Sequence, residues 1–123
     1  MLIIYHNPRC SKSRGGLELT QQFAEKHQLD LDVVDYQKTP LTLLQLTELH
    51  QILQSEQTVS ILDMTRDNEE LFATLALKDA SDDDLLKALA AHPQLLQRPI
   101  IRYNHRAVIA RPPELVNTIL HMQ

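Results

Sequence analysis

The sequence has one cysteine, Cys10, among its 123 residues. A single cysteine excludes a disulfide within the chain and indicates a reducing compartment, so we expect a cytoplasmic protein. Basic residues are few for a nucleic-acid-binding surface, because 12 Lys and Arg stand against 16 Asp and Glu and the net charge is −4. A basic leader and a membrane-spanning apolar run are also lacking at the N-terminus, so neither export nor membrane association is expected.

Motifs for metal and phosphatase chemistry are missing as well. No metal site is predicted, because five of the histidines show no metal-ligand spacing with Cys10 or with one another: His27, His50, His92, His105 and His121. The aspartates at 82–84 follow Ser81 and suit the positive end of a helix, which makes them a helix start rather than a metal cluster. A phosphatase of the Cys-x5-Arg type is excluded because Gly16 stands where its arginine would be.

The surroundings of Cys10 favour a reactive thiolate. An apolar strand is expected over residues 2–5, followed by a polar loop and by a helix over residues 13–26. A thiol at the start of a helix faces unpaired backbone N–H groups and the positive end of the helix dipole. Three cations lie near it in sequence: Arg9, Lys12 and Arg14. Such surroundings lower a thiol pKa from about 8.5 to roughly 3.5–7.5, whereas a small buried apolar role suits these polar neighbours poorly.

The order of the expected elements indicates an α/β fold. Strands are expected over residues 2–5, 31–36, 100–103 and 107–110, and helices over residues 13–26, 42–53 and 113–121, with others between them. The first two strands flank a helix and should form a right-handed βαβ unit with parallel strands. Asn104-His105 allows a tight hairpin, so the last two strands should be antiparallel.

The middle of the chain, about residues 42–96, is expected to be a helical insertion. Thr42 can cap the helix over residues 42–53, and Ser81 can begin a further helix. The apolar stripe of the first of these helices consists of Leu43, Leu44, Leu46, Leu49, Ile52 and Leu53.

The two glycines of the chain, Gly15 and Gly16, fall in the first turn of the helix after Cys10. Each costs a helix roughly 1 kcal/mol relative to alanine. Their position therefore predicts that backbone or a ligand approaches this turn closely.

Three short motifs follow one another along the chain: His6-Asn7-Pro8-x-Cys10-x-x-Ser13-Arg14, Arg98-Pro99-Ile100 and Arg111-Pro112-x-Glu114. Together they resemble the glutaredoxin-coupled arsenate reductase family, and the resemblance runs from Ile3 to about Leu120. It implies a thioredoxin-like fold, with a mixed four-stranded sheet (βαβ, then ββα) and the helical insertion, in a single domain over residues 1–123.

The resemblance also implies roles for individual residues. Cys10 matches the cysteine whose thiolate attacks the arsenic of arsenate, and His6 and Ser13 match positions that help to hold it as thiolate. Three arginines match those that bind the oxyanion in the family, Arg66, Arg98 and Arg111, and Arg14 is a further candidate for oxyanion binding. Pro99 matches the proline that thioredoxin-like folds carry in cis beside the active site. Arg9 and Lys12 depart from the family pattern; they could strengthen oxyanion capture or mark a subgroup with another substrate.

The single cysteine also determines the electron source. Arsenate reduction takes two electrons, and one thiol cannot resolve its own adduct by an internal disulfide. The chain must use external thiols, most simply glutathione followed by glutaredoxin, so we expect glutathione as a co-substrate and no bound cofactor. The expected partners are arsenate or a similar oxyanion, glutathione and glutaredoxin, with no nucleic acid and no membrane. We expect a reductase of arsenate to arsenite; the alternative is a thiol redox adaptor or regulatory binding protein of the same fold.

Overall fold

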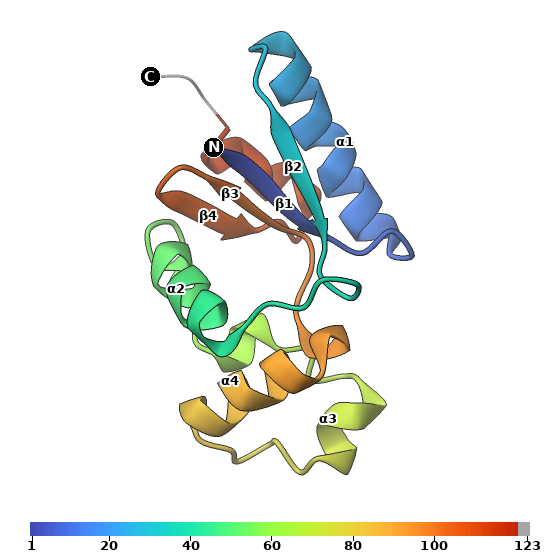
Figure 1. Cartoon of the computed structure of the whole chain (residues 1–123), viewed down its shortest axis with the longest axis vertical. Helices are drawn as coiled ribbons and strands as arrows, with labels where there is room; N and C mark the ends of the chain where they lie inside the picture. Colours follow the sequence, from blue (N-terminus) through green and yellow to red (C-terminus); the bar gives the residue numbers. More distant parts are fainter. Residues whose placement is uncertain (121–123) are drawn as a thin grey trace.

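Strand β1 (Leu2–His6) is an inner strand of a four-stranded mixed sheet (Figure 1). The computed structural model describes residues 1–120. The strand order is β2-β1-β3-β4, with β2 at Leu31–Asp35, β3 at Ile100–Tyr103 and β4 at Arg106–Ile109. β1 pairs in parallel with β2 and antiparallel with β3, and β3 and β4 form an antiparallel hairpin. The mixed sheet, the βαβ unit and the hairpin are all confirmed.

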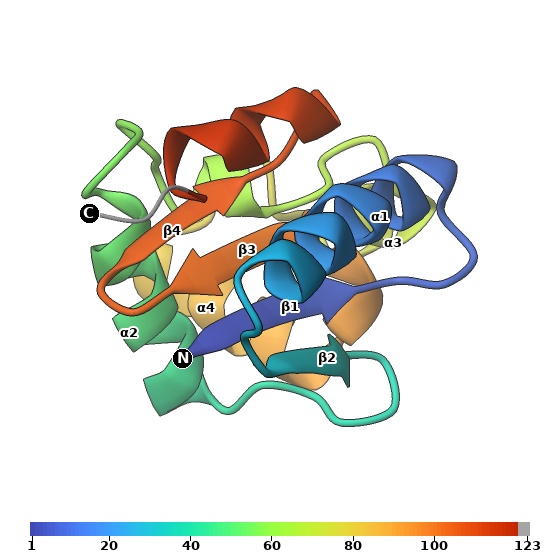
Figure 2. The same cartoon turned by 90° about the horizontal axis from the view of Figure 1, so that it is seen from above.

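Helices cover both faces of the sheet. They are α1 (Ser11–Lys26), α2 (Leu43–Leu53), α3 (Glu70–Thr74) and α4 (Asp82–Ala91), with the 3₁₀ helices η1 (Leu62–Met64), η2 (Pro93–Leu95) and η3 (Pro113–Thr118). Figure 2 shows α1 and η3 on one face and α2 and α4 on the other. Successive strand residues divide between two apolar cores: Ile100 packs with residues of α2 and α4, and Ile101 packs with residues of α1 and η3.

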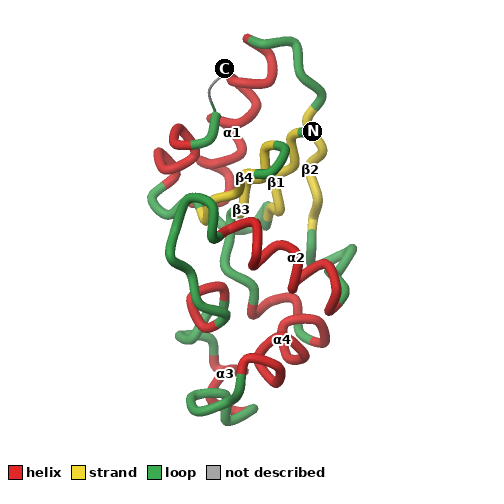
Figure 3. Tube along the Cα trace, turned by 90° about the vertical axis from the view of Figure 1, so that its left-hand side faces the viewer, coloured by secondary structure: helices red, strands yellow, loops and turns green. Residues whose placement is uncertain are grey.

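The helices of the insertion, α2, α3 and α4, gather on one side of the sheet (Figure 3). Thr42 caps α2 as expected: its side chain accepts from the Gln45 N–H at 3.1 Å, and the Gln45 side chain accepts from the Thr42 N–H at 2.9 Å. Ser81 caps α4 through a single hydrogen bond, in which its side chain accepts from the Asp84 N–H at 3.2 Å. Within residues 1–120, no helix is long and apolar enough to cross a membrane.

The apolar stripe expected on α2 is partly wrong. Leu46, Leu49 and Leu53 recur at intervals of three and four and are buried, whereas Leu44 is 77% exposed and Leu43 is 43% exposed. Leu44 lies two residues before Leu46, roughly 200° around the helix, so it points away from the face that Leu46 buries. Leu43 opens the first turn, at the end of the helix.

Two helix boundaries also differ from expectation. α1 begins at Ser11 rather than at Ser13, so Cys10 itself is the N-cap residue. The helix expected over residues 113–121 is instead the 3₁₀ helix η3, in which the Leu115 N–H donates to the Pro112 carbonyl and the Ile119 N–H donates to the Val116 carbonyl, each three residues back. The expected end at His121 and the last residues of the expected 1–123 domain lie outside the described residues.

The predicted close approach to the glycines of α1 is present at Gly16, which lies in the second turn because the helix begins at Ser11, and the approaching group is a proline ring. A Cβ atom on Gly16 would lie 2.6 Å from Cγ of Pro99, closer than side-chain atoms can pack, and Pro99 is a rigid ring. A Cβ atom on Gly15 would meet Pro113 at an ordinary 3.5 Å. Gly16 thus allows α1 to press against the segment that begins β3.

We predict opposite effects for alanine at these two glycines. Gly16→Ala should lower the free energy of unfolding by about 1–3 kcal/mol, because overpacking against Pro99 exceeds the gain in helix propensity. Gly15→Ala should leave stability unchanged or raise it by up to about 1 kcal/mol. Urea unfolding of the two variants measures the difference; equal stabilities would show that the Gly16–Pro99 contact is not tight.

Candidate functional site

Cys10 stands between a tight turn and the first residue of α1. Its backbone is extended (φ −100°, ψ 124°), and its carbonyl accepts the Arg14 N–H at 3.0 Å. In the preceding turn, the Cys10 N–H donates to the Asn7 carbonyl at 3.0 Å, and the Arg9 N–H donates to Asn7 Oδ1 at 3.0 Å. The partly exposed thiol is therefore fixed at the positive end of a 16-residue helix.

The surroundings of Cys10 lower the pKa of its thiol. Burial acts in the opposite direction and raises the pKa, but it is outweighed by the backbone N–H of Ser13, the guanidinium of Arg98 and the backbone N–H of Lys12. The two backbone groups belong to the first turn of α1, where N–H groups have no partner within the helix. The expected lowering of the thiol pKa is confirmed in direction, and the leading cation is Arg98, which is far from Cys10 in sequence.

His6 and Ser13 are joined across the loop that carries Cys10. His6 Nδ1 and Ser13 Oγ share a hydrogen bond of 2.8 Å, and Ser13 Oγ also accepts from the Asn7 N–H at 2.9 Å. All three residues are buried. Burial lowers the pKa of His6 and favours its neutral form, while the charge of Asp35 acts in the opposite direction. These bonds fix the turn through side chains that solvent does not reach.

Arg98 reaches Cys10 because of the sheet register. Tyr5 of β1 pairs with Ile100 of the antiparallel β3, so the chain leaving β1 and the chain entering β3 meet at one edge. The Arg98 side chain is nearly covered, since the residue is only 9% exposed. Its Nε and Nη1 atoms are buried and have no hydrogen-bond partner among residues 1–120. A buried cation with two available donors therefore lies beside a stabilised thiolate.

Arg111 joins this group from the end of β4. Its Nη1 donates to the Arg98 carbonyl at 3.3 Å. Each of the two arginines precedes a cis proline, Pro99 and Pro112, and the cis geometry expected at Pro99 is thus confirmed. The β3–β4 hairpin thus brings the Arg111 guanidinium to the backbone of Arg98, and these are two of the four arginines expected to bind an oxyanion.

Arg66 and Arg14, the other two oxyanion candidates, contact other groups. Arg66 lies on a segment that pairs with the approach to Arg98, where its N–H donates to the Leu95 carbonyl at 2.7 Å. Its guanidinium forms a 3.2 Å ion pair with Glu69. The Arg14 guanidinium donates to the Pro8 carbonyl at 3.0 Å and is exposed.

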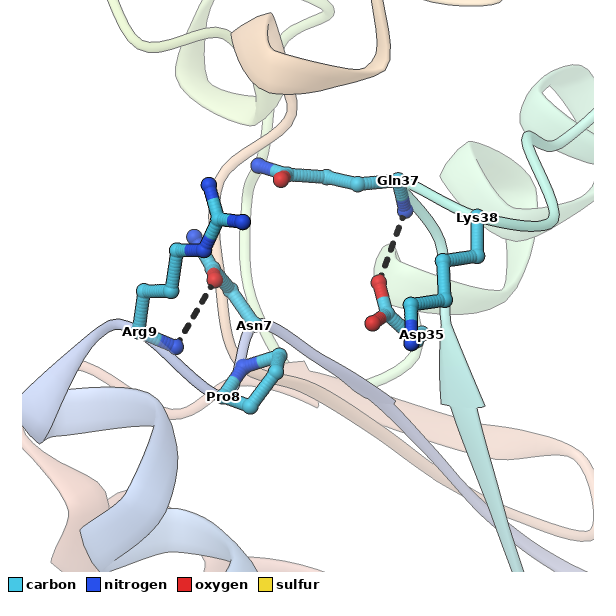
Figure 4. A pocket seen from close by; sticks show the side chains of 6 residues that line it. All are labelled: Asn7, Pro8, Arg9, Asp35, Gln37 and Lys38. Atoms are coloured by element: carbon cyan, nitrogen blue, oxygen red, sulfur yellow. Dashed lines mark hydrogen bonds between the residues drawn. The ribbon is translucent and has the colours of Figure 1, made fainter.

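Sequence reasoning missed several residues at the end of β2. The Tyr36 hydroxyl is buried without a hydrogen-bond partner in the described chain, and burial raises its pKa to about 12, while the charge of Arg98 acts to lower it. Asp35, Gln37 and Lys38 line a pocket with Asn7, Pro8 and Arg9 (Figure 4). One signal could have found them, because the carboxyl ends of the parallel strands β1 and β2 meet at the same edge of the sheet.

A metal-binding cluster is not part of this arrangement. Within residues 1–120, no group of three or more His, Cys, Asp or Glu side chains is placed to hold a metal ion. The chemistry that the site offers rests on a thiolate, buried guanidinium groups and backbone N–H groups.

Comparison with known proteins identifies the family to which this arrangement belongs. Residues 5–119 match the model of the ArsC family. The chain belongs to the ArsC family. An arsenate reductase of Neisseria meningitidis serogroup A is 39% identical over 119 residues, which cover 95% of this chain and 96% of the relative. The uncharacterized protein YfgD of Escherichia coli K12 is also 39% identical, with 95% and 94% covered.

A solved structure gives the same result for the fold of this ArsC-family chain. An arsenate reductase from Vibrio cholerae superposes with a TM-score of 0.84 at 40% identity, and 96% of each chain is covered. The family and the α/β fold with its mixed four-stranded sheet, both expected from the sequence motifs, are therefore confirmed.

We predict that Arg98 sets the ionisation of Cys10. Arg98→Met should raise the thiol pKa, because it removes a positive charge from beside the thiolate, so less thiolate remains at neutral pH. Arg98→Lys, which keeps the charge, should raise the thiol pKa less. The ultraviolet absorbance of the thiolate, followed over a pH titration, measures these midpoints.

Arg102→Met is the matched control, because Arg102 also belongs to this part of the sheet and forms an ion pair with Glu48. It should leave the midpoint unchanged. A midpoint that moves equally in both methionine variants would mean that net charge, rather than the position of Arg98, sets the thiol pKa.

Proposed function

We propose that this ArsC-family chain reduces arsenate to arsenite, with the Cys10 thiolate as nucleophile and with external thiols as the electron source. One observation carries the proposal: a buried guanidinium with two unpartnered donors lies beside a thiolate of lowered pKa. An anion that enters such a site finds charge and hydrogen-bond donors that are already desolvated. Relatives named arsenate reductase, at 39% identity over almost the whole chain, support the same function.

The first step is attack of the Cys10 sulfur on arsenic. Thiolate and arsenate are both negative, so their approach requires that positive charge be placed around the oxyanion. Arg98 supplies it next to the sulfur, and Arg111 supplies a second planar guanidinium that can hold two oxygens at once. A sulfur–arsenic bond forms, and one arsenate oxygen leaves as water after taking up protons. Arsenic remains As(V).

The second step needs a thiol from outside the chain. A glutathione thiolate attacks the Cys10 sulfur, a sulfur–sulfur bond forms, and the sulfur–arsenic bond breaks with its electron pair left on arsenic. Arsenic leaves as As(III) in arsenite, and Cys10 is left as a mixed disulfide with glutathione. A further thiol, supplied by glutaredoxin, then restores Cys10. This requirement for cellular thiols suits a cytoplasmic protein.

His6 and Ser13 act in this scheme as positioning residues. Ser13 Oγ ties His6 and the Asn7 N–H together, and the Ser13 backbone N–H stabilises the sulfur. The turn and the start of α1 therefore keep Cys10 in place while its charge changes. The Ser13 N–H therefore acts on the sulfur, and the Ser13 hydroxyl holds the conformation of the loop.

Arg66 and Arg14 take secondary roles. Arg66 must exchange its ion pair with Glu69 for the oxyanion before it can contribute a third guanidinium. Its segment pairs with residues just before Arg98, through the Thr65–Leu96 bridge, which supports a place for Arg66 near the site. Arg14 adds an exposed positive charge near Cys10, and its guanidinium donates a hydrogen bond to the Pro8 carbonyl.

The proposal is tested by arsenate-dependent NADPH oxidation in the presence of glutathione, glutaredoxin and glutathione reductase. Cys10→Ser should abolish turnover, because the nucleophile is lost. Arg98→Met should lower kcat/KM for arsenate by about a hundredfold, the usual effect of removing one donor to a developing oxyanion. Arg102→Met, which removes an arginine paired with Glu48, should retain full activity.

Two outcomes would contradict the proposal. Turnover that survives in Cys10→Ser would exclude Cys10 as nucleophile. A wild-type protein that forms the mixed disulfide with glutathione but does not turn over arsenate would instead be the redox adaptor that the sequence leaves open.

A further inference from the structure

A second recognition site adjoins the turn that carries Cys10. It is a pocket of about 420 Å³ lined by Asn7, Pro8, Arg9, Asp35, Gln37 and Lys38. This volume lies within the roughly 300–1,000 Å³ that small-molecule pockets occupy. One wall is the Cys10 turn itself, because the Asn7 carbonyl accepts the Cys10 N–H at 3.0 Å. The pocket is therefore built in part by the turn that leads directly to Cys10.

The opposite wall is a rigid turn at the end of β2. The Asp35 carbonyl accepts from the N–H groups of Lys38 at 3.1 Å and Thr39 at 2.9 Å, and Asp35 Oδ1 accepts from the Gln37 N–H at 3.1 Å. In Figure 4 the Gln37 amide extends from this turn toward the Arg9 guanidinium on the loop side. The two walls thus present polar groups to the same space, on turns whose backbones are fixed by hydrogen bonds.

The charges that line this pocket are of both signs, which distinguishes it from the Arg98 site. Arg9 and Lys38 are exposed cations, and Asp35 supplies a carboxylate. A compact, doubly charged oxyanion is repelled by Asp35 and needs neither amide. A short peptide fits better, because it carries carboxylates for the two cations, an ammonium group for Asp35 and amide groups for Asn7 and Gln37.

We propose that this pocket binds the peptide portion of the thiol co-substrate, a zwitterionic tripeptide of the glutathione type, and directs its sulfur to Cys10. The inference rests on the proposed function for the identity of the thiol. It assigns a role to Arg9: this residue binds the carboxylate of the reducing thiol, whereas arsenate binds at Arg98. The pocket then speeds attack on the Cys10 sulfur by holding the incoming thiol next to it.

The pocket can be tested without arsenate by thiol–disulfide exchange. The Cys10 thiolate attacks oxidised glutathione, a mixed disulfide forms, and one glutathione thiolate leaves; mass spectrometry follows the rate. The double variant Arg9→Gln with Lys38→Gln should slow this reaction about tenfold or more, since a charge-assisted hydrogen bond contributes about 1.5–3 kcal/mol. The rate with bis(2-hydroxyethyl) disulfide, which has no charged groups, should not change.

Lys26→Gln is the control for loss of a positive charge away from the pocket, because Lys26 lies at the far end of α1. It should leave both rates unchanged. Equal slowing with both disulfides, or no slowing with oxidised glutathione, would overturn the pocket assignment. The outcome is independent of arsenate turnover, so selective slowing in a protein that does not reduce arsenate would retain the pocket and reject the proposed function.

Discussion

The contact on which the site depends is the one between the buried Arg98 guanidinium and the Cys10 thiolate. Each is costly to bury alone: desolvation raises the pKa of the thiol, and two nitrogens of Arg98 have no hydrogen-bond partner in the described chain. Placed together, the cation favours the anion, and the first-turn N–H groups of α1 add to this effect. The site thus holds a buried positive charge and hydrogen-bond donors that a ligand can use, and this arrangement lowers the stability of the folded protein.

The fold brings these two groups together through elements far apart in sequence. The antiparallel register of β1 and β3 places the loop after β1 next to the loop before β3, and the hairpin carries Arg111 back to the Arg98 carbonyl. Gly16 allows α1 to pack closely against Pro99, and this contact sets the distance between α1 and the segment of Arg98 and Pro99 that leads into β3. The parallel pairing of β1 with β2 places the pocket of Arg9 and Lys38 at the same edge. The Arg98 guanidinium and the pocket of Arg9 and Lys38 thus both lie close to the turn that carries Cys10.

Local signals predicted much of the fold and part of the site. Thr42 and Ser81 cap their helices because capping depends on a few neighbouring residues, and Asn104 takes the positive φ that the hairpin turn requires. Long-range features were beyond such reasoning. That the cation beside Cys10 is Arg98, rather than the nearby basic residues, follows from strand pairing across the chain. The exposure of Leu44 depends likewise on which face of α2 meets the sheet.

Arsenic anomalous diffraction from crystals soaked in arsenate tests the proposed site most directly. We predict one arsenic atom at bonding distance from the Cys10 sulfur, with its oxygens in contact with the guanidiniums of Arg98 and Arg111. Arsenic bound elsewhere, or bonded to Cys10 with its oxygens turned away from both arginines, would contradict the central role given to the buried guanidinium.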